Sequence, residues 1–197
     1  MKIKNSKLKI QNLANFIFEA STLKRLQRTG WQILGDNQES VAAHSFMVAV
    51  ISYVLAKTLN IDNYKVVIMA LFHDFTEARV GDVYKLADLY ISVDEKKASS
   101  DAFASPITDD LFKMNQEYEK EKTVEAKIVH DADTLALCIE LKQLIEKGNL
   151  HAKEWYNANL TRLKLNQSKV IAEEITRGNS QNWWKKEREK LHKSFKK

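Results

Sequence analysis

The sequence is poor in the residues that interrupt helices. Its 197 residues include one proline and five glycines, and long stretches consist of Leu, Lys, Glu, Ala and Ile. Proline and glycine are the least favourable residues in a helix interior, so their scarcity favours an all-α fold. The length suffices for one domain with a sizeable core and is short for two.

Cysteine is nearly absent, and long apolar runs are absent too. The single cysteine, Cys138, excludes an intramolecular disulfide, and in the apolar stretch TLALCIEL we interpret it as a small core residue. No segment reaches the roughly 18 apolar residues of a membrane span. The N-terminus has lysines but no apolar run long enough for a signal peptide. We therefore expect a cytoplasmic protein with no membrane partner.

The positive charge is unevenly distributed. The net charge is +5, and the excess lies in the two ends, MKIKNSKLKI and WWKKEREKLHKSFKK. A basic end can contact nucleic acid or an anionic membrane, but a solvated helix face is the simpler interpretation. No motif of interleaved aromatic and basic residues supports nucleic-acid binding. A mildly positive chain also suits a phosphorylated substrate.

The apolar periodicity predicts a series of helices in a single domain, residues 1–197. Small polar residues and the only proline, in SVDEKKASSDAFASPITDD, predict a mobile connection or lid over 92–110. The expected helices cover residues 6–26, Ser40 to about Leu59 with Ser40 as N-cap, 63–77 capped by Asp62, the stretches DLFKMNQEYEKEK and TVEAKIVHDADTLALCIELKQLIEKG with Gly148 as the stop, and two or three segments over 149–193.

Three titratable residues stand at the end of the third predicted helix, in ALFHDFTEARVGD (residues 70–82). His73, Asp74 and Glu77 share one helix face, because residues three and four apart are neighbours. Such groups are costly to bury unless they are paired or bind a metal. Imidazole with carboxylate suits Zn, Mn, Co, Fe or Ni, whereas an all-oxygen shell suits Mg or Ca. His44, in the first turn of the second helix, is a further candidate ligand.

A second group of candidates lies in KIVHDADTLA. At about 100° per residue, the apolar stripe of this helix leaves His130 nearly opposite the core. Asp131 and Asp133 flank the stripe on its two sides. The periodicity therefore disfavours His130 as a ligand and does not choose between the two aspartates.

Four motifs in order, LKRLQRTGW, ESVAAHS, ALFHDFTEARVGD and EAKIVHDADTL, resemble those of the HD-domain metal-dependent phosphohydrolases. Within that family they look like the 5'-deoxynucleotidase branch, the YfbR-like and HD-domain-containing-2-like proteins. The resemblance covers about residues 22–145, the motif-bearing core, and C-terminal helices follow over 149–193. It implies a single all-α HD-domain helical bundle, usually a homodimer, that binds one divalent metal ion. The implied metal ligands are His44, His73, Asp74 and Asp133.

The same resemblance implies the catalytic and substrate-binding residues. Glu77 would help to activate the attacking water, and Asp82 would protonate the leaving 5'-oxygen or orient the water. Arg28 would meet the substrate phosphate, and Trp31 would approach the sugar. Simpler interpretations compete with each role: a surface ion pair of Glu77 with Arg79 or Lys85, an N-cap at Asp82, Arg25 in place of Arg28, and Trp31 as a core residue.

One position departs from the family pattern. The residue before the first ligand is often acidic in the family, whereas here it is Ala43. If that acid supports the first histidine, the site has lost a partner of a metal ligand.

The expected function is a metal-dependent 5'-nucleotidase that hydrolyses deoxyribonucleoside 5'-monophosphates, with a small nucleotide as its partner. The ion would be Co, Mn, Zn, Fe or Ni rather than Mg. The alternatives are another HD-type nucleotide phosphohydrolase or phosphodiesterase, or a non-catalytic nucleotide-binding HD protein. The guanosine tetraphosphate hydrolases have a Glu-Asp pair where this chain has Glu77-Ala78, which disfavours that activity. Two-metal phosphodiesterases need additional histidines between the HD pair and the last aspartate, and His130 is the only histidine between Asp74 and Asp133.

Overall fold

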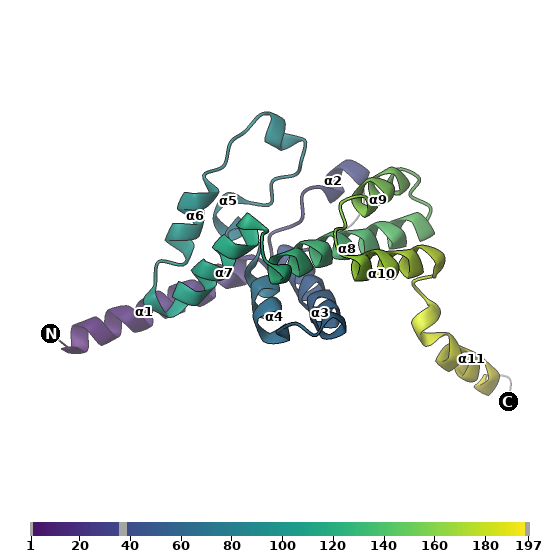
Figure 1. The fold of residues 1–197 in the computed structure, drawn as a ribbon, viewed down its shortest axis with the longest axis horizontal. Coiled ribbons are helices and arrows are strands. Elements are labelled where there is room, and N and C mark those ends of the chain that lie inside the picture. Colours follow the sequence, from purple (N-terminus) through teal and green to yellow (C-terminus); the bar gives the residue numbers. More distant parts are fainter. Residues whose placement is uncertain (1, 36–38, 196–197) are drawn as a thin grey trace.

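The computed structural model describes residues 2–35 and 39–195, and it describes side chains from Ile10 onward. Within these residues the chain is helical, with an isolated antiparallel bridge between Gln27 and Ser40 as its β-type pairing (Figure 1). The predicted all-α fold is confirmed.

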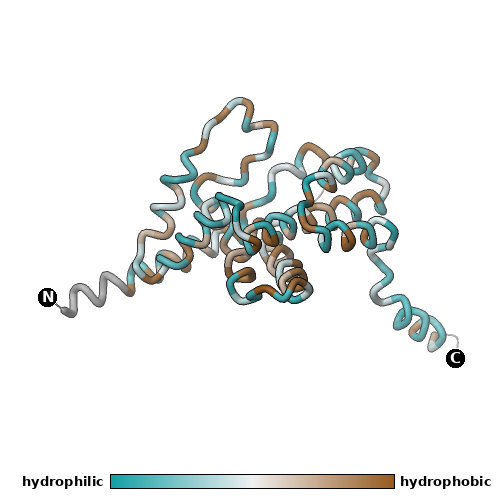
Figure 2. The backbone as a smooth tube through the Cα atoms, viewed as in Figure 1, coloured by the Kyte–Doolittle hydropathy of each residue, from teal (hydrophilic) through white to brown (hydrophobic). Residues whose placement is uncertain are grey.

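Three helices form the centre of the domain: α3 (Val41–Leu59), α4 (Asn63–Phe72) and α8 (Val124–Glu146). Their facing sides are apolar, and Figure 2 shows hydrophobic residues concentrated where they meet. Burying such surface is the main favourable contribution to folding. The fully buried side chains shared by these helices include Val48, Leu55, Val66, Met69, Ile128, Val129 and Leu135.

Polar side chains fix where these helices begin. The Ser40 hydroxyl accepts a hydrogen bond from the backbone N–H of Ala43 at 3.2 Å, and the Asp62 carboxylate accepts one from Tyr64 at 3.0 Å. Both contacts satisfy backbone donors that have no partner within the helix. The predicted caps Ser40 and Asp62 are therefore confirmed. Past the end of α8, Gly148 adopts the left-handed conformation (φ 98°) that favours glycine at a helix stop.

The third helix ends earlier than the sequence suggests. α4 stops at Phe72, a tight turn follows, and the short helix α5 (Glu77–Val80) begins at Glu77, so the predicted helix over 63–77 is wrong in its last turn. The physical cause is a cluster of aromatic rings. Phe75 is fully buried with its ring centroid 4.7 Å from that of Phe16, and backbone bonds three residues apart turn the chain so that it reaches this position.

The segment predicted as a mobile connection over 92–110 contains a helix, α6 (Glu95–Ala102), followed by a 3₁₀ turn over Pro106–Thr108 and then α7 (Asp109–Lys120). Asp94 caps α6 by accepting a bond from Lys97 at 2.9 Å. The Ser99 hydroxyl donates to the Asn115 side chain of α7 at 2.6 Å, and both are buried. One serine of this Ser-rich segment thus makes a buried contact between two helices, which a loop interpretation does not anticipate.

The remaining elements surround this centre. The short helix α2 lies within the predicted loop QRTGWQILGDNQES, of which residues 36–38 are outside the described residues. Figure 1 shows α1 and α11 extending away from the body at opposite ends, and a long excursion over 81–94 at the top that includes a 3₁₀ turn at Ala87–Leu89. The elements are α1 (Lys2–Thr22), α2 (Trp31–Leu34), α9 (Ala152–Leu160), α10 (Asn166–Arg177), the 3₁₀ turn Asn182–Trp184 and α11 (Lys185–Ser194).

The two basic ends are described only in part. The side chains of residues 1–9 and the last two lysines lie outside the described residues, so the charge of MKIKNSKLKI is not placed on any surface. The described part of the C-terminal end is the exposed helix α11 with the turn before it, where the guanidinium of Arg188 lies 5.1 Å from the Trp184 ring centroid.

By length and composition, α3 is apolar enough to cross a membrane, with a mean hydropathy of 1.5 over Val41–Leu59. The prediction that no segment reaches this limit is therefore wrong by that criterion. Half of this apolar segment is buried inside the protein, and α3 packs against α4 and α8. The central helix of a folded domain meets the same criterion, so one such helix is weak grounds for a membrane span.

Candidate metal centre and pocket

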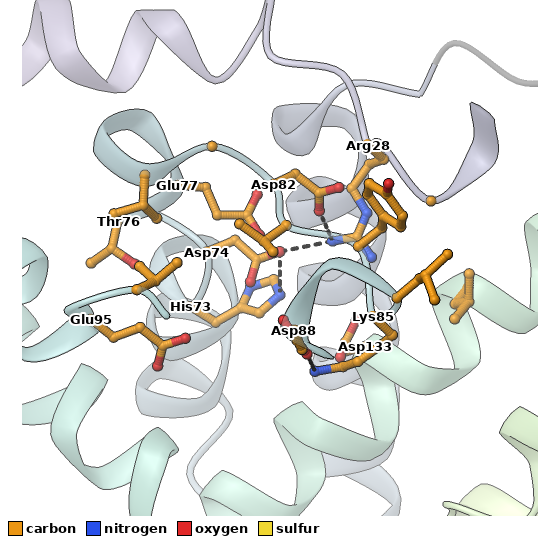
Figure 3. Close-up of a pocket in the computed structure, with 18 of the residues that line it drawn as sticks. Arg28, His73, Asp74, Thr76, Glu77, Asp82, Lys85, Asp88, Glu95 and Asp133 are labelled. Atoms are coloured by element: carbon orange, nitrogen blue, oxygen red, sulfur yellow. Dashed lines mark hydrogen bonds and ion pairs between the residues drawn. The ribbon is translucent and has the colours of Figure 1, made fainter. Parts of the chain in front are cut away.

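Four side chains from three separate segments of the chain meet below the 81–94 excursion. His44 comes from the first turn of α3, His73 and Asp74 directly follow α4, and Asp133 comes from α8. His44 Nε2 lies 2.9 Å from Asp133 Oδ1 and 3.9 Å from Asp74 Oδ2, and His73 Nε2 lies 3.1 Å from Asp74 Oδ2. Figure 3 shows Asp74 and His73 side by side, with Asp133 approaching from another helix. The structure therefore brings all four predicted ligands together.

The donor atoms fit a cation. The nearest atoms of His44, His73 and Asp133 all lie within 4.8 Å of one another. His73 Nδ1 is 2.7 Å from the carbonyl oxygen of Ala70, so in the neutral ring this nitrogen carries the proton and Nε2 keeps its lone pair. That Nε2 is buried and makes no hydrogen bond, although a carboxylate oxygen of Asp74 is only 3.1 Å away. Two acceptor atoms this close favour a positive ion between them.

The titration behaviour agrees with a site built for positive charge. Burial lowers the pKa of His73, but the adjacent Asp74 carboxylate outweighs this effect and the pKa is raised overall. For Asp74, burial raises the pKa, while the charges of His73 and Arg28 lower it to about 2. The carboxylate is therefore ionised at every physiological pH.

The structure separates the two aspartates that periodicity could not. Asp131 is buried and accepts hydrogen bonds from the backbone N–H groups of Lys164 and Leu165, at 2.9 and 2.8 Å, ahead of α10. Asp133 faces the histidines and lines the pocket. Asp131 is thus occupied in joining α8 to α10, and Asp133 is the one placed at the centre.

His130 lies elsewhere than predicted. Helical periodicity placed it opposite the core, but it is half-buried and its ring stacks on Tyr118 of α7, with centroids 4.0 Å apart. Its Nε2 is 3.0 Å from the Tyr118 carbonyl oxygen. The cause is that α7 covers the side of α8 that would otherwise face solvent.

Glu77 faces the same pocket without a positive partner of its own. Its Oε2 atom is buried and makes no hydrogen bond. Burial, followed by the negative charges of Asp74 and Asp82, raises its pKa to about 10. The cations that could have made it a surface ion pair are engaged elsewhere: Arg79 bonds Glu19 at 2.8 Å, and Lys85 bonds Asp88 at 3.0 Å.

Arg28 enters the site through a turn that Asp82 fixes. Its guanidinium lies 3.1 Å from Asp74 Oδ2 and 3.6 Å from Asp82 Oδ1. The other oxygen of Asp82 accepts hydrogen bonds from the backbone N–H and the hydroxyl of Thr29, at 2.5 and 2.8 Å. Asp82 therefore binds a distant turn rather than capping the segment that follows it. The rival residue Arg25 is exposed and does not line the pocket.

The pocket is a cavity of about 530 Å³, which is in the size range of small-ligand sites. We call its charged lining residues around the metal centre, together with His73, the metal wall, and the apolar lining residues from α2, α8, α9 and the 81–94 excursion the apolar wall. The metal wall consists of Arg28, His73, Asp74, Glu77, Asp82 and Asp133. The apolar wall consists of Ile33, Leu86, Ile91, Leu137 and Trp155.

The sequence did not single out the apolar wall. Trp155 and Leu137 belong to ordinary amphipathic helices, and no spacing marks them as pocket residues. Trp31, the predicted sugar contact, also lines the cavity, but its side chain is only 2% exposed and its indole N–H donates to Glu39 at 3.1 Å. Most of Trp31 therefore packs in the core beside α8 and α9.

Comparison with known proteins agrees with this geometry. The family model described as HD domain matches residues 20–177. The chain is 28% identical over 167 residues to a protein named 5'-deoxynucleotidase HDDC2 from Xenopus laevis, covering 78% of this chain and 81% of that one. It is 29% identical over 152 residues to 5'-deoxynucleotidase hdd1 from Schizosaccharomyces pombe, covering 70% and 75%. Among solved structures, PH0347 protein from Pyrococcus horikoshii is 34% identical with a TM-score of 0.72, covering 83% and 98%.

Proposed function

The chain belongs to the HD domain family, and we propose that it is a 5'-nucleotidase that hydrolyses deoxyribonucleoside 5'-monophosphates to deoxynucleosides and phosphate. The observation that carries the proposal is the metal wall. One buried histidine, two ionised aspartates, a buried glutamate and an arginine line one cavity, and a second buried histidine, His44, lies 2.9 Å from Asp133. These are the groups that metal-assisted hydrolysis of a phosphomonoester can use. The relatives named 5'-deoxynucleotidase support the choice of substrate.

His44, His73, Asp74 and Asp133 would hold one divalent ion. The mixed nitrogen and oxygen donors favour Co, Mn, Zn, Fe or Ni over Mg. When bound, the ion would supply a Lewis acid that makes a water molecule nucleophilic near neutral pH.

The chain's own residues would carry the remaining steps. Arg28 would bind two phosphate oxygens through its planar fork, for which lysine is a poor substitute. In the metal-free protein Glu77 is protonated at neutral pH, because its pKa is about 10. The charge of a bound cation would lower that pKa, and the ionised carboxylate would then accept a proton from the water as it attacks phosphorus. As the bond between phosphorus and the 5'-oxygen breaks, that oxygen would gain the proton that Glu77 took from the water. Asp82 is bonded to Thr29 through one oxygen, so its first role would be to hold Arg28 in place.

The apolar wall would receive the nucleoside. With the phosphate beside Arg28, the rest of the nucleotide would point toward Trp155, Leu137 and Ile33. Stacking of a base on an aromatic ring is sequence-tolerant, because every base has a π-face. This arrangement would favour nucleotides over phosphorylated sugars without a base, and it leaves little discrimination among bases.

The protein would act as a cytoplasmic homodimer. Support for a dimer comes from α3, whose outward face carries four apolar side chains at helical spacing: Phe46, Val50, Tyr53 and Val54. A contiguous exposed apolar stripe of this kind is typical of an interface. Light scattering coupled to gel filtration would measure the mass, and Val50→Glu would convert a dimer to a monomer if this face forms the contact.

Phosphate release from a panel of nucleotides would test the activity. Chelated protein would receive Co, Mn, Zn or Mg, with Glu77→Ala as the control variant. We expect metal-dependent release from deoxynucleoside monophosphates that the control loses. Release only from cyclic or pyrophosphate substrates would keep the HD chemistry and overturn the substrate. No release from protein shown to bind a metal would overturn the nucleotidase assignment.

A further inference from the structure

The two histidines of the metal centre are supported in different ways. His73 has its Nδ1 fixed by the Ala70 carbonyl oxygen, which leaves Nε2 facing the centre. His44 also turns Nε2 toward the centre, 2.9 Å from Asp133, but its Nδ1 is buried and makes no hydrogen bond. The Asp133 carboxylate attracts a proton to Nε2, whereas only the form that carries its proton on Nδ1 can bind a metal through Nε2.

The group that faces this nitrogen is a carboxylate that the sequence motifs did not single out. Glu39 Oε1 lies 3.9 Å from His44 Nδ1, about 1 Å beyond hydrogen-bond distance. The Glu39 side chain is only 7% exposed, and its other oxygen accepts the indole N–H of Trp31 at 3.1 Å. Its backbone carbonyl oxygen accepts the N–H of Arg28 at 2.9 Å. Glu39 thus touches the turn of Arg28, the ring of Trp31 and the back of His44.

The position that the family pattern suggested for this support does not face the ligand. Ala43 is exposed, and its backbone N–H is taken by Ser40. An acidic side chain at position 43 would start on the solvent side of α3, away from the buried imidazole. The absence of an acid there therefore removes no partner of His44, and the concern raised by the sequence is resolved by Glu39.

We propose that Glu39 is a positioning residue for the metal centre: its carboxylate holds the proton on His44 Nδ1, so that Nε2 is presented to the ion. A carboxylate behind a ligating histidine fixes its ring orientation and strengthens it as a ligand, and loss of such a partner costs roughly 10- to 100-fold in metal affinity. The proposal rests on the divalent-metal site of the proposed function.

Glu39→Gln is the direct test, because the amide keeps the shape of the side chain but cannot carry its charge. Isothermal titration of chelated protein with Co²⁺ and with Mn²⁺ would measure affinity, and circular dichroism would check the fold. We expect affinity to fall roughly 10- to 100-fold. Trp31→Phe is the matched variant: it removes the indole donor but leaves Glu39 intact, so affinity should stay within about threefold of wild type. Equal losses in the two variants would mean that Glu39 only anchors Trp31, and would overturn the proposal.

A second readout needs no metal. Nitrogen-15 NMR of the histidine rings, assigned with His44→Gln, should show more proton on His44 Nδ1 in chelated wild type than in chelated Glu39→Gln, where only Asp133, 2.9 Å from Nε2, still attracts the proton. Equal protonation of Nδ1 in the two proteins would overturn the proposal whatever the affinities. If wild type binds neither ion, the proposed function fails at its metal site, and the NMR result still decides the role of Glu39. If wild type binds and Glu39→Gln binds equally well, the role of Glu39 fails alone.

Discussion

The two walls of the pocket differ in how their side chains are held. On the metal wall each described side chain is buried or half-buried, and most are fixed by a charged or hydrogen-bonded neighbour, as Asp74 is by His73 and Arg28. On the apolar wall Ile33, Leu86 and Ile91 are each about half exposed. Rigid, pre-oriented charges suit the reacting atoms, whereas exposed apolar side chains can adapt to different bases. In the proposed function, one wall would therefore fix the chemistry and the other the choice of substrate.

The largest difference between the walls should appear when a predicted ligand is removed. Asp133→Asn replaces a charged donor by a neutral amide, and we expect loss of metal binding and a fall of roughly 10³-fold in kcat/KM, about 4 kcal/mol. Phosphate release and metal titration would measure both. Asp131→Asn is the matched control, because it weakens the contact with Lys164 and Leu165 and should lower the melting temperature while the metal still binds. The reverse pattern would show that the aspartates were assigned the wrong way round.

Arg28→Lys should have the next largest effect. The charge remains but the bidentate fork is lost, so we expect kcat/KM to fall by about 10²-fold. Inhibition by inorganic phosphate should weaken in parallel, and steady-state kinetics would measure both. Arg25→Lys, on the exposed side of the same segment, should change neither value. Equal effects at the two positions would argue against phosphate binding by Arg28.

The apolar wall should respond in KM rather than in kcat. Trp155→Leu removes a stacking surface, and we expect KM for a deoxynucleoside monophosphate to rise about tenfold with kcat unchanged, as for an interaction made equally in ground and transition states. The same variant should leave turnover of deoxyribose 5-phosphate unaltered, since that compound has no base. Trp183→Leu, at an exposed site in the C-terminal segment, is the control. A fall in kcat for Trp155→Leu would place this residue among the groups that act on the reacting atoms.

The smallest effect concerns the stability of the metal-free protein. The pKa of Glu77 is about 10 when folded, far above its ordinary value of 4.5. Between these values the folded state holds one more proton than the unfolded state, so stability falls as pH rises, by up to about 1.4 kcal/mol per unit. Glu77→Gln removes this loss. With chelator present, the excess of its melting temperature over that of wild type should grow by a few degrees for each pH unit between pH 5 and pH 8.5. Parallel curves from pH 5 to 9 would show that Glu77 is ionised in the folded protein.

Local signals in the sequence were enough to predict much of the fold. Ser40 and Asp62 cap their helices through neighbours two or three residues away, and α3 and α8 are long enough for their apolar pattern to show. The end of α4 was missed because it depends on Phe75 reaching Phe16, 59 positions earlier in the chain. Helix α6 was missed for a similar reason, since Ser99 is stabilised by Asn115 of the next helix.

The residues of the candidate site also fall into those that local motifs predict and those that depend on distant parts of the chain. The motifs pointed to His44, His73, Asp74 and Asp133, and the structure places them together. Periodicity alone could not separate Asp133 from Asp131, because what distinguishes them is the backbone of residues 164–165, more than 30 positions away. Trp155 and Glu39 were missed because each reaches the site through packing that no short motif records.

His44 and Asp133 are separated by 89 positions in the sequence. Of the four proposed ligands, only His73 and Asp74 are neighbours in an unfolded chain, and two donors bind weakly. High affinity would exist only after α3, α4 and α8 have docked, so the ion would be captured at the end of folding rather than guiding it. Retention of the ion would then report that the three central helices are correctly assembled, and a chain with a loosened core would lose its metal before it lost its helices.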